Sequence, residues 1–171
     1  MKQKIILFAF LIFSIFSVNV FATEQTSDLL IIGENTVFLK TFPLEQLEMK
    51  YRPFGVGEEG KYSNTNCWRG YRAVWKIIDE KLFLEKIIQC NNSPGEENIV
   101  ELFEKNGIQY QEKDGMILAD WCTLDFYRMT SPISIFDKNR TYLYSGWDKL
   151  IKRKKKIILQ IENGLIRKNK L

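Results

Sequence analysis

Residues 71–88 read YRAVWKIIDEKLFLEKII and are the most informative stretch of the chain. Large apolar side chains alternate along both halves, and Asp79-Glu80 separates them, which is typical of two strands joined by a tight turn. Folding the halves about that turn produces matched pairs: Ile77 with Leu82, Trp75 with Leu84, Tyr71 with Ile88, and Ala73 with Lys86. Because cross-strand pairs fix register, the pattern predicts a hairpin with one apolar face.

Similar patterns extend outward from this hairpin. Apolar runs flank turn residues at 33–35, at 113–115 and at Asn163-Gly164, which predicts hairpins over 29–40, 108–122 and 156–168. Further strands are expected at 133–136 and 141–144. Residues 52–66 hold Pro53, three glycines and a polar stretch, which predicts a long surface loop.

One helix is expected near 94–105. Ser93 is a capping residue, Pro94 suits the first helical position, and Glu96 completes a capping box. Ile99, Leu102 and Phe103 then form a buried stripe. The fold class expected is therefore mainly β (α+β): antiparallel hairpins forming a sheet or small barrel that carries one short helix. Strands do not alternate with helices, so a doubly wound parallel sheet is not expected.

The N-terminus reads as an export signal. A basic start, Met1-Lys2-Gln3-Lys4, precedes an apolar run that ends in small residues, so residues 1–22 are expected to be cleaved after Ala22. A retained membrane anchor is the alternative, although the run is about the shortest that spans a bilayer. Residues 23–171 have the size of a single globular domain. The pattern predicts export from the cytoplasm.

Charge and composition exclude several classes of function. Losing Lys2 and Lys4 lowers the formal charge from +4 to +2, so no nucleic-acid partner is expected. The chain contains no His, which removes Ser-His and Cys-His nucleophile pairs and most zinc sites. No metal and no cofactor is expected.

The three cysteines are Cys67, Cys90 and Cys122. Export permits disulfides, and an odd count leaves at least one thiol over or an intermolecular bond. In the register above Cys90 faces residue 69, so Cys67 is a diagonal neighbour at roughly 7–8 Å, too far unless the strand ends converge. A Cys67–Cys90 bond therefore stays open. Cys122 is expected to end an apolar strand as a buried thiol.

Paired carboxylates are the catalytic system that works without His. Asp120, beside Trp121, is the candidate acid, with Asp125 and Glu85 as partners. The alternative is that Asp120 caps or pairs at the sheet margin. Binding candidates are Trp68 and Arg69, an aromatic and cationic pair, which can instead be structural. The run Lys152, Arg153, Lys154, Lys155, Lys156 is a candidate for contact with an anionic membrane surface or an acidic protein, or else a lysine-guarded edge strand.

Three patches carry a resemblance: residues 68–75 (WRGYRAVW), 117–121 (ILADW) and 161–164 (IENG). Together they resemble an uncharacterised group of small bacterial proteins with a W-R-G-Y-x-A-x-W segment. The group has an aromatic residue, Ser or Thr, and Gly after the later tryptophan, whereas this chain has Cys122-Thr123-Leu124. The resemblance implies a bacterial setting, with the periplasm or the cell exterior as the destination, and no activity.

These observations favour an exported, non-enzymatic binding or inhibitor-like protein with a protein partner in the envelope. The first alternative is a His-free hydrolase that uses Asp120 on envelope glycans. The second is an envelope structural protein held to lipid through residues 152–156.

Overall fold

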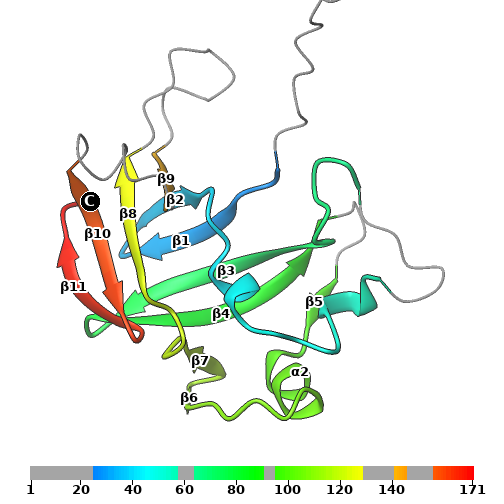
Figure 1. Ribbon diagram of the computed structural model, residues 1–171. Coiled ribbons are helices and arrows are strands. Elements are labelled where there is room, and N and C mark those ends of the chain that lie inside the picture. Colours follow the sequence, from blue (N-terminus) through cyan, green and yellow to red (C-terminus); the bar gives the residue numbers. More distant parts are fainter. Residues whose placement is uncertain (1–24, 58–63, 91–94, 129–140, 146–155) are drawn as a thin grey trace, which may run out of the picture.

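The computed structural model describes residues 25–57, 64–90, 95–128, 141–145 and 156–171. Figure 1 shows the elements that they form. The strands are β1 Asp28–Ile32, β2 Asn35–Leu39, β3 Tyr71–Ile78, β4 Lys81–Gln89, β5 Glu96–Glu97, β6 Glu112–Lys113, β7 Met116–Leu118, β8 Leu124–Arg128, β9 Tyr142–Tyr144, β10 Ile157–Glu162 and β11 Leu165–Asn169. The helical elements are α2 Ile99–Lys105 and two 3-10 turns, Pro43–Gln46 and Pro53–Gly55.

Eight of these strands close into a barrel, which confirms the mainly β fold class predicted from the sequence. Their order around the barrel is β11-β10-β8-β9-β2-β1-β3-β4, and β11 pairs back onto β4 through Leu165 and Lys81. The closing contact includes the Leu82 N–H donating to the carbonyl of Gly164 at 2.8 Å. Closure leaves these eight strands without a free edge, which protects the sheet from pairing with other chains.

Two strand pairs are parallel, in a barrel that is otherwise antiparallel. β1 lies parallel to β3, with Leu30 opposite Trp75, and β2 lies parallel to β9. Both parallel contacts join segments far apart in the sequence. The local turn signals predicted the hairpins, whereas they carry no information about these long-range pairs.

The main hairpin has the predicted register near its turn and a different one beyond a bulge. Ile77 faces Leu82 and Trp75 faces Leu84, as predicted. Between Val74 and Trp75 the register shifts, so Ala73 faces Ile87 rather than Lys86. The predicted pairs of Ala73 with Lys86 and of Tyr71 with Ile88 are therefore wrong. The bulge has a clear physical reason, because it takes the lysine off the apolar face and places Ile87, which is fully buried, in its position.

The helix is shorter than predicted. It begins at Ile99, and the Asn98 side chain accepts a hydrogen bond from the Glu101 N–H, so Asn98 is the capping residue. Glu96 lies in β5, which pairs with β4, and Ser93 and Pro94 fall outside the described residues. Pairing with the edge of β4 thus outcompetes the capping box. The buried stripe is confirmed: Ile99, Leu102 and Phe103.

The three flanking hairpins are confirmed as β1–β2, β6–β7 and β10–β11. The strand predicted at 133–136 lies outside the described residues, and β9 matches the one predicted at 141–144. β8 was not predicted, because its sequence LDFYR has no turn signal and only a short alternation.

Side chains fill the barrel interior. An eight-stranded barrel is just wide enough to be filled in this way. Trp75 is fully buried and meets Trp121 edge-on, with ring centroids 6.4 Å apart, and Trp121 contacts Phe103 of α2 at 5.5 Å. The helix is therefore attached to the barrel through aromatic packing, and sites for a ligand must be sought outside the core.

Two turn glycines provide a matched test of this packing. Gly164 and Gly115 have nearly the same positive φ, +73° and +76°, but a Cβ at Gly164 would lie 2.8 Å from the Ala119 carbonyl oxygen, whereas one at Gly115 meets nothing within 4 Å. Gly115→Ala should cost about 1 kcal/mol from backbone strain alone. Gly164→Ala should cost about 2–4 kcal/mol, since backbone atoms cannot rotate away. Urea unfolding of both variants measures the difference, and equal losses would contradict the close approach of the two segments.

Candidate functional site

Arg69 does not lie on the surface, so the expectation that it contacts a partner is wrong. Its side chain is fully buried and forms an ion pair with Asp28, with 2.8 Å between Nη1 and Oδ1. Its other terminal nitrogen donates to the Thr26 carbonyl, also at 2.8 Å. The physical reason is the parallel β1–β3 contact, which brings the counter-charge of Asp28 beneath the start of β3.

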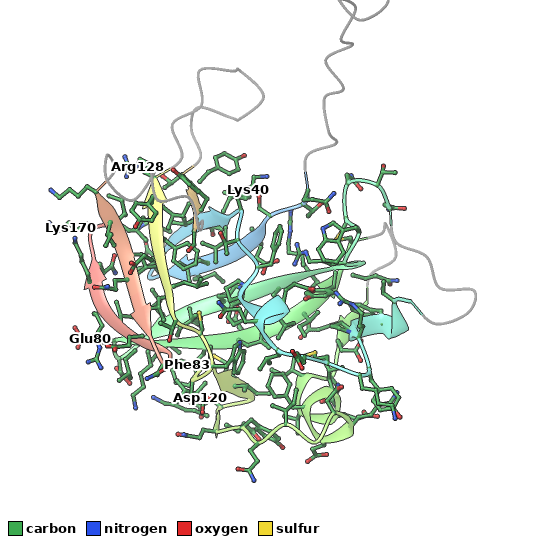
Figure 2. The ribbon with its side chains drawn as sticks, viewed as in Figure 1. Lys40, Glu80, Phe83, Asp120, Arg128 and Lys170 are labelled. Atoms are coloured by element: carbon green, nitrogen blue, oxygen red, sulfur yellow. A yellow bond between two sulfur atoms is a disulfide. The ribbon has the colours of Figure 1, made fainter. Side chains whose placement is uncertain are left out.

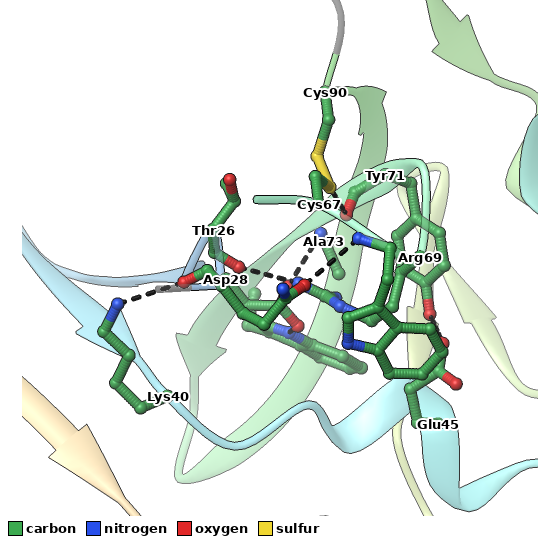
Figure 3. Close-up of polar contacts among 12 residues, drawn as sticks. Thr26, Asp28, Lys40, Glu45, Cys67, Arg69, Tyr71, Ala73 and Cys90 are labelled. Carbon is green, nitrogen blue, oxygen red and sulfur yellow. Dashed lines mark hydrogen bonds and ion pairs between the residues drawn. A yellow bond between two sulfur atoms is a disulfide. The ribbon is translucent and has the colours of Figure 1, made fainter. Parts of the chain in front are cut away.

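Asp28 is at the centre of a hydrogen-bonded network (Figure 3). Besides Arg69, its carboxylate accepts from the Ala73 N–H at 3.2 Å and from the indole N–H of Trp75 at 3.1 Å. Burial raises the pKa of Asp28, and the Arg69 charge together with these hydrogen bonds opposes the increase. The network therefore satisfies both carboxylate oxygens of a fully desolvated charge.

Aromatic rings enclose the Arg69 guanidinium. Its central carbon lies 3.6 Å from the centroid of Phe42 and 5.0 Å from that of Tyr71. The Tyr71 hydroxyl donates to Glu45, which also accepts from Arg52 at 2.6 Å. Burial raises the pKa of Tyr71, and the Glu45 charge adds to the increase. The phenol therefore stays a donor that holds Glu45 in place.

A disulfide joins Cys67 and Cys90, whose Cα atoms lie 6.4 Å apart. The bulge in β4 moves the pairing by one residue, so the Cys90 N–H donates to the Gly70 carbonyl rather than facing residue 69. A turn that begins at Cys67, with the Gly70 N–H donating to its carbonyl, then brings the sulfurs together. The strand ends converge here, as the sequence argument required for a bond.

Trp68 follows Cys67 of the disulfide and precedes Arg69 of the ion pair, and it is 47% exposed. The backbone N–H of Trp68 donates to the side-chain carbonyl of Gln25 at 3.1 Å. The Arg52 guanidinium lies over the Trp68 ring, 5.7 Å from its centroid. Of the two expected surface residues, only Trp68 is therefore presented to solvent. Nothing in the sequence identified Arg52 as its neighbour, because the contact spans a loop with no periodic signal.

A pocket of about 660 Å³ opens beside the chain that follows β2, where β9 ends. Most of its lining residues have polar side chains: Thr41, Phe42, Glu45, Gln46, Thr123, Leu124, Asp125, Ser145, Gln160, Ile161, Glu162 and Arg167. Every carboxylate in the lining is held by a donor of the protein. Glu45 pairs with Arg52, Asp125 accepts from Gln160 at 3.0 Å, and Glu162 pairs with Arg167 at 2.8 Å.

The three candidate acids are not assembled around this pocket. Asp125 lines it, but Asp120 is exposed and is not part of the lining (Figure 2). Glu85 lies in β4, where its carboxylate pairs with Lys76 at 3.2 Å.

Only the last residue of the basic run, Lys156, is described, and residues 152–155 lie outside the described ranges. Lys156 is exposed where β10 begins, near Lys168 and Lys170 at the end of β11. The charges of Lys156 and then of Lys168 lower the pKa of Lys170. Arg128 ends β8 at the same barrel end (Figure 2).

Cys122 is a buried free thiol, although it does not end a strand as expected. β7 ends at Leu118, and Cys122 follows in a turn in which its N–H donates to the Ala119 carbonyl. Burial raises the pKa of its thiol to about 12, so it is not a nucleophile at neutral pH.

Within the described ranges, no three Cys, Asp or Glu side chains gather as metal ligands would. The helices described there are too short and too polar to cross a bilayer. The chain matches no known family model, no curated protein and no solved structure.

Replacing Asp28 by Asn should destabilise the protein strongly. The change leaves the Arg69 charge buried without its partner, which costs about 3–5 kcal/mol. Asp79→Asn is the matched control, because Asp79 pairs with Lys113 in an exposed bridge and its loss should cost under about 1 kcal/mol. Chemical unfolding monitored by circular dichroism compares the two, and a small loss for Asp28→Asn would contradict the buried pair.

Thiol titration tests both the disulfide and the burial of Cys122. Native protein should not react with iodoacetamide at pH 8, because a pKa of about 12 leaves roughly one thiolate in ten thousand. Reactivity should rise only as the pH approaches that pKa. Unfolding without reductant should release one thiol and with reductant three. Three thiols without reductant would contradict the Cys67–Cys90 bond.

Proposed function

We propose that the protein is an exported, non-enzymatic binding protein whose contact surface is centred on Trp68. The observation that carries the proposal is a large indole held 47% exposed on a loop that is fixed on both sides. Cys67 is bound to Cys90, and Arg69 is bound to Asp28 inside the barrel. Tryptophan and arginine are the residues that most often dominate binding energy.

The anchored loop reduces the cost of binding. Ordering a mobile side chain on association costs about 0.5–1.5 kcal/mol, and a prearranged one avoids much of this. Gln25 already fixes the backbone of Trp68, and Arg52, held by Glu45, already lies over its ring. These contacts hold the exposed Trp68 in a fixed position, as binding with little loss of entropy requires.

Among the described residues, the contacts of the pocket do not favour hydrolysis. Glycoside hydrolysis needs two carboxyl groups that are free to act on one substrate. Glu45 and Glu162 are each held by an arginine, Arg52 and Arg167. Asp120 has no place in the lining of the pocket. The hydrolase alternative therefore gains no support from these contacts.

Export is supported by two independent features. Residues 1–22 have the pattern of a cleavable signal, and a structural disulfide forms and persists in oxidising compartments such as the periplasm.

The lysine cluster of Lys156, Lys168 and Lys170 lies where β10 begins and β11 ends. It is remote in the barrel from the start of β3, so it is not part of the Trp68 surface.

Trp68→Ala should abolish specific capture of the binding partner from the native envelope. The matched control is Leu171→Ala, because Leu171 is the other large apolar side chain that is exposed in the described part of the chain, at 41%. Tagged wild-type protein and both variants are incubated with solubilised envelope, and the eluates are compared by mass spectrometry for proteins and by sugar analysis. Thermal unfolding confirms that the variants fold.

Wild type and Leu171→Ala should retain the same species, and Trp68→Ala should lose it. An identical eluate from all three proteins would overturn the assignment of Trp68 as the centre of the contact surface.

A further inference from the structure

We propose that the ligand bound at Trp68 is a glycan, with the apolar face of one pyranose ring resting on the exposed indole. This inference rests on the proposed function and specifies its ligand class. It follows from the small apolar area at the site, the polar groups around it, and the fixed position of the ring.

The apolar area that the described residues expose around Trp68 is too small for a stable protein interface. Such interfaces bury about 800 Å² on each partner around an apolar core with several large side chains. Among the described residues, Trp68 and Leu171 are the large apolar side chains that are exposed, and Leu171 follows the far end of β11. A single indole surrounded by polar groups matches one sugar ring in size. The C–H bonds of that ring complement the electron-rich indole face.

Uncharged hydrogen-bonding residues precede Trp68 in the chain, and Gln25 contacts its backbone. Thr65 and Asn66 immediately precede Cys67 and are exposed. The amide of Gln25 donates to the Thr65 carbonyl at 2.8 Å, and the Thr26 N–H donates to the Asn66 carbonyl at 2.7 Å. These contacts attach Thr65 and Asn66 to the residues that lead into β1. Amide and hydroxyl groups of this kind pair with sugar hydroxyls, which are both donors and acceptors.

Arg52 completes the site as a positioning residue. It lies over Trp68 and is paired with Glu45, whose other donor is the buried phenol of Tyr71. Contacts through Arg52 and Glu45 to the buried Tyr71 therefore link the position of the indole to the barrel core.

The test uses soluble glycans as probes. Chitohexaose, cellohexaose, maltohexaose and peptide-free murein glycan strands are titrated into the purified protein by calorimetry and by tryptophan fluorescence. At least one class should bind to wild type. Trp68→Ala should weaken that binding about tenfold or more, since truncating a dominant anchor costs above 1 kcal/mol. Trp68→Phe should restore most of the affinity, because it retains an aromatic face, and Leu171→Ala should match wild type.

Salt provides a further readout. Because a neutral glycan carries no charge, its affinity should change little between 50 mM and 500 mM NaCl, whereas an ionic contact would weaken.

The outcomes separate this inference from the function on which it rests. If none of the glycans binds but the envelope capture retains a protein through Trp68, the glycan inference is overturned and the binding function stands. If neither experiment shows a Trp68-dependent ligand, both fall. Glycan binding that Trp68→Ala leaves unchanged would place the sugar site elsewhere and overturn the inference.

Discussion

The buried ion pair between Asp28 and Arg69 is the interaction on which the rest of the structure depends. It connects the first strand of the barrel to the turn that opens β3, and so specifies a parallel contact that no local turn imposes. Replacing a buried pair by apolar residues is often neutral in stability, whereas breaking one is costly. We infer that the pair contributes specificity more than net stability, because it penalises every arrangement that leaves one charge buried alone.

The same pair explains the division of roles within residues 68–71. Arg69 and Tyr71 are both buried, and the intervening Gly70 has a positive φ of +74°, which glycine adopts at little steric cost. A Cβ at Gly70 would also overlap the side chain of Val56. Three of the four residues are therefore fixed by structural requirements. Trp68 alone is directed outward, and it carries the proposed contact.

Local signals in the sequence predicted the antiparallel half of the fold. Asn163-Gly164 and Asp114-Gly115 specified their hairpins because a two-residue turn with positive φ requires such residues. The parallel contacts and the ion pair of Arg69 were missed, because each depends on a partner more than forty residues away. The bulge that leaves Glu85 of β4 unpaired in the register was also missed. Within the candidate site, Trp68 was identified in the sequence by its residue type. Arg52 and most of the pocket lining were not, because folding brings these residues together from separate segments.

The buried polar groups of the described residues also bear on the proposed binding role. The described interior is filled by side chains, and its buried charges, Asp28 and Arg69, neutralise one another. A reactive group in such a core would lack both substrate access and water. The disulfide instead ties the turn before β3 to the end of β4. In the proposed binding role, Trp68 beside this bond presents one aromatic ring in a fixed position, which lowers the entropic cost of contacting a ligand.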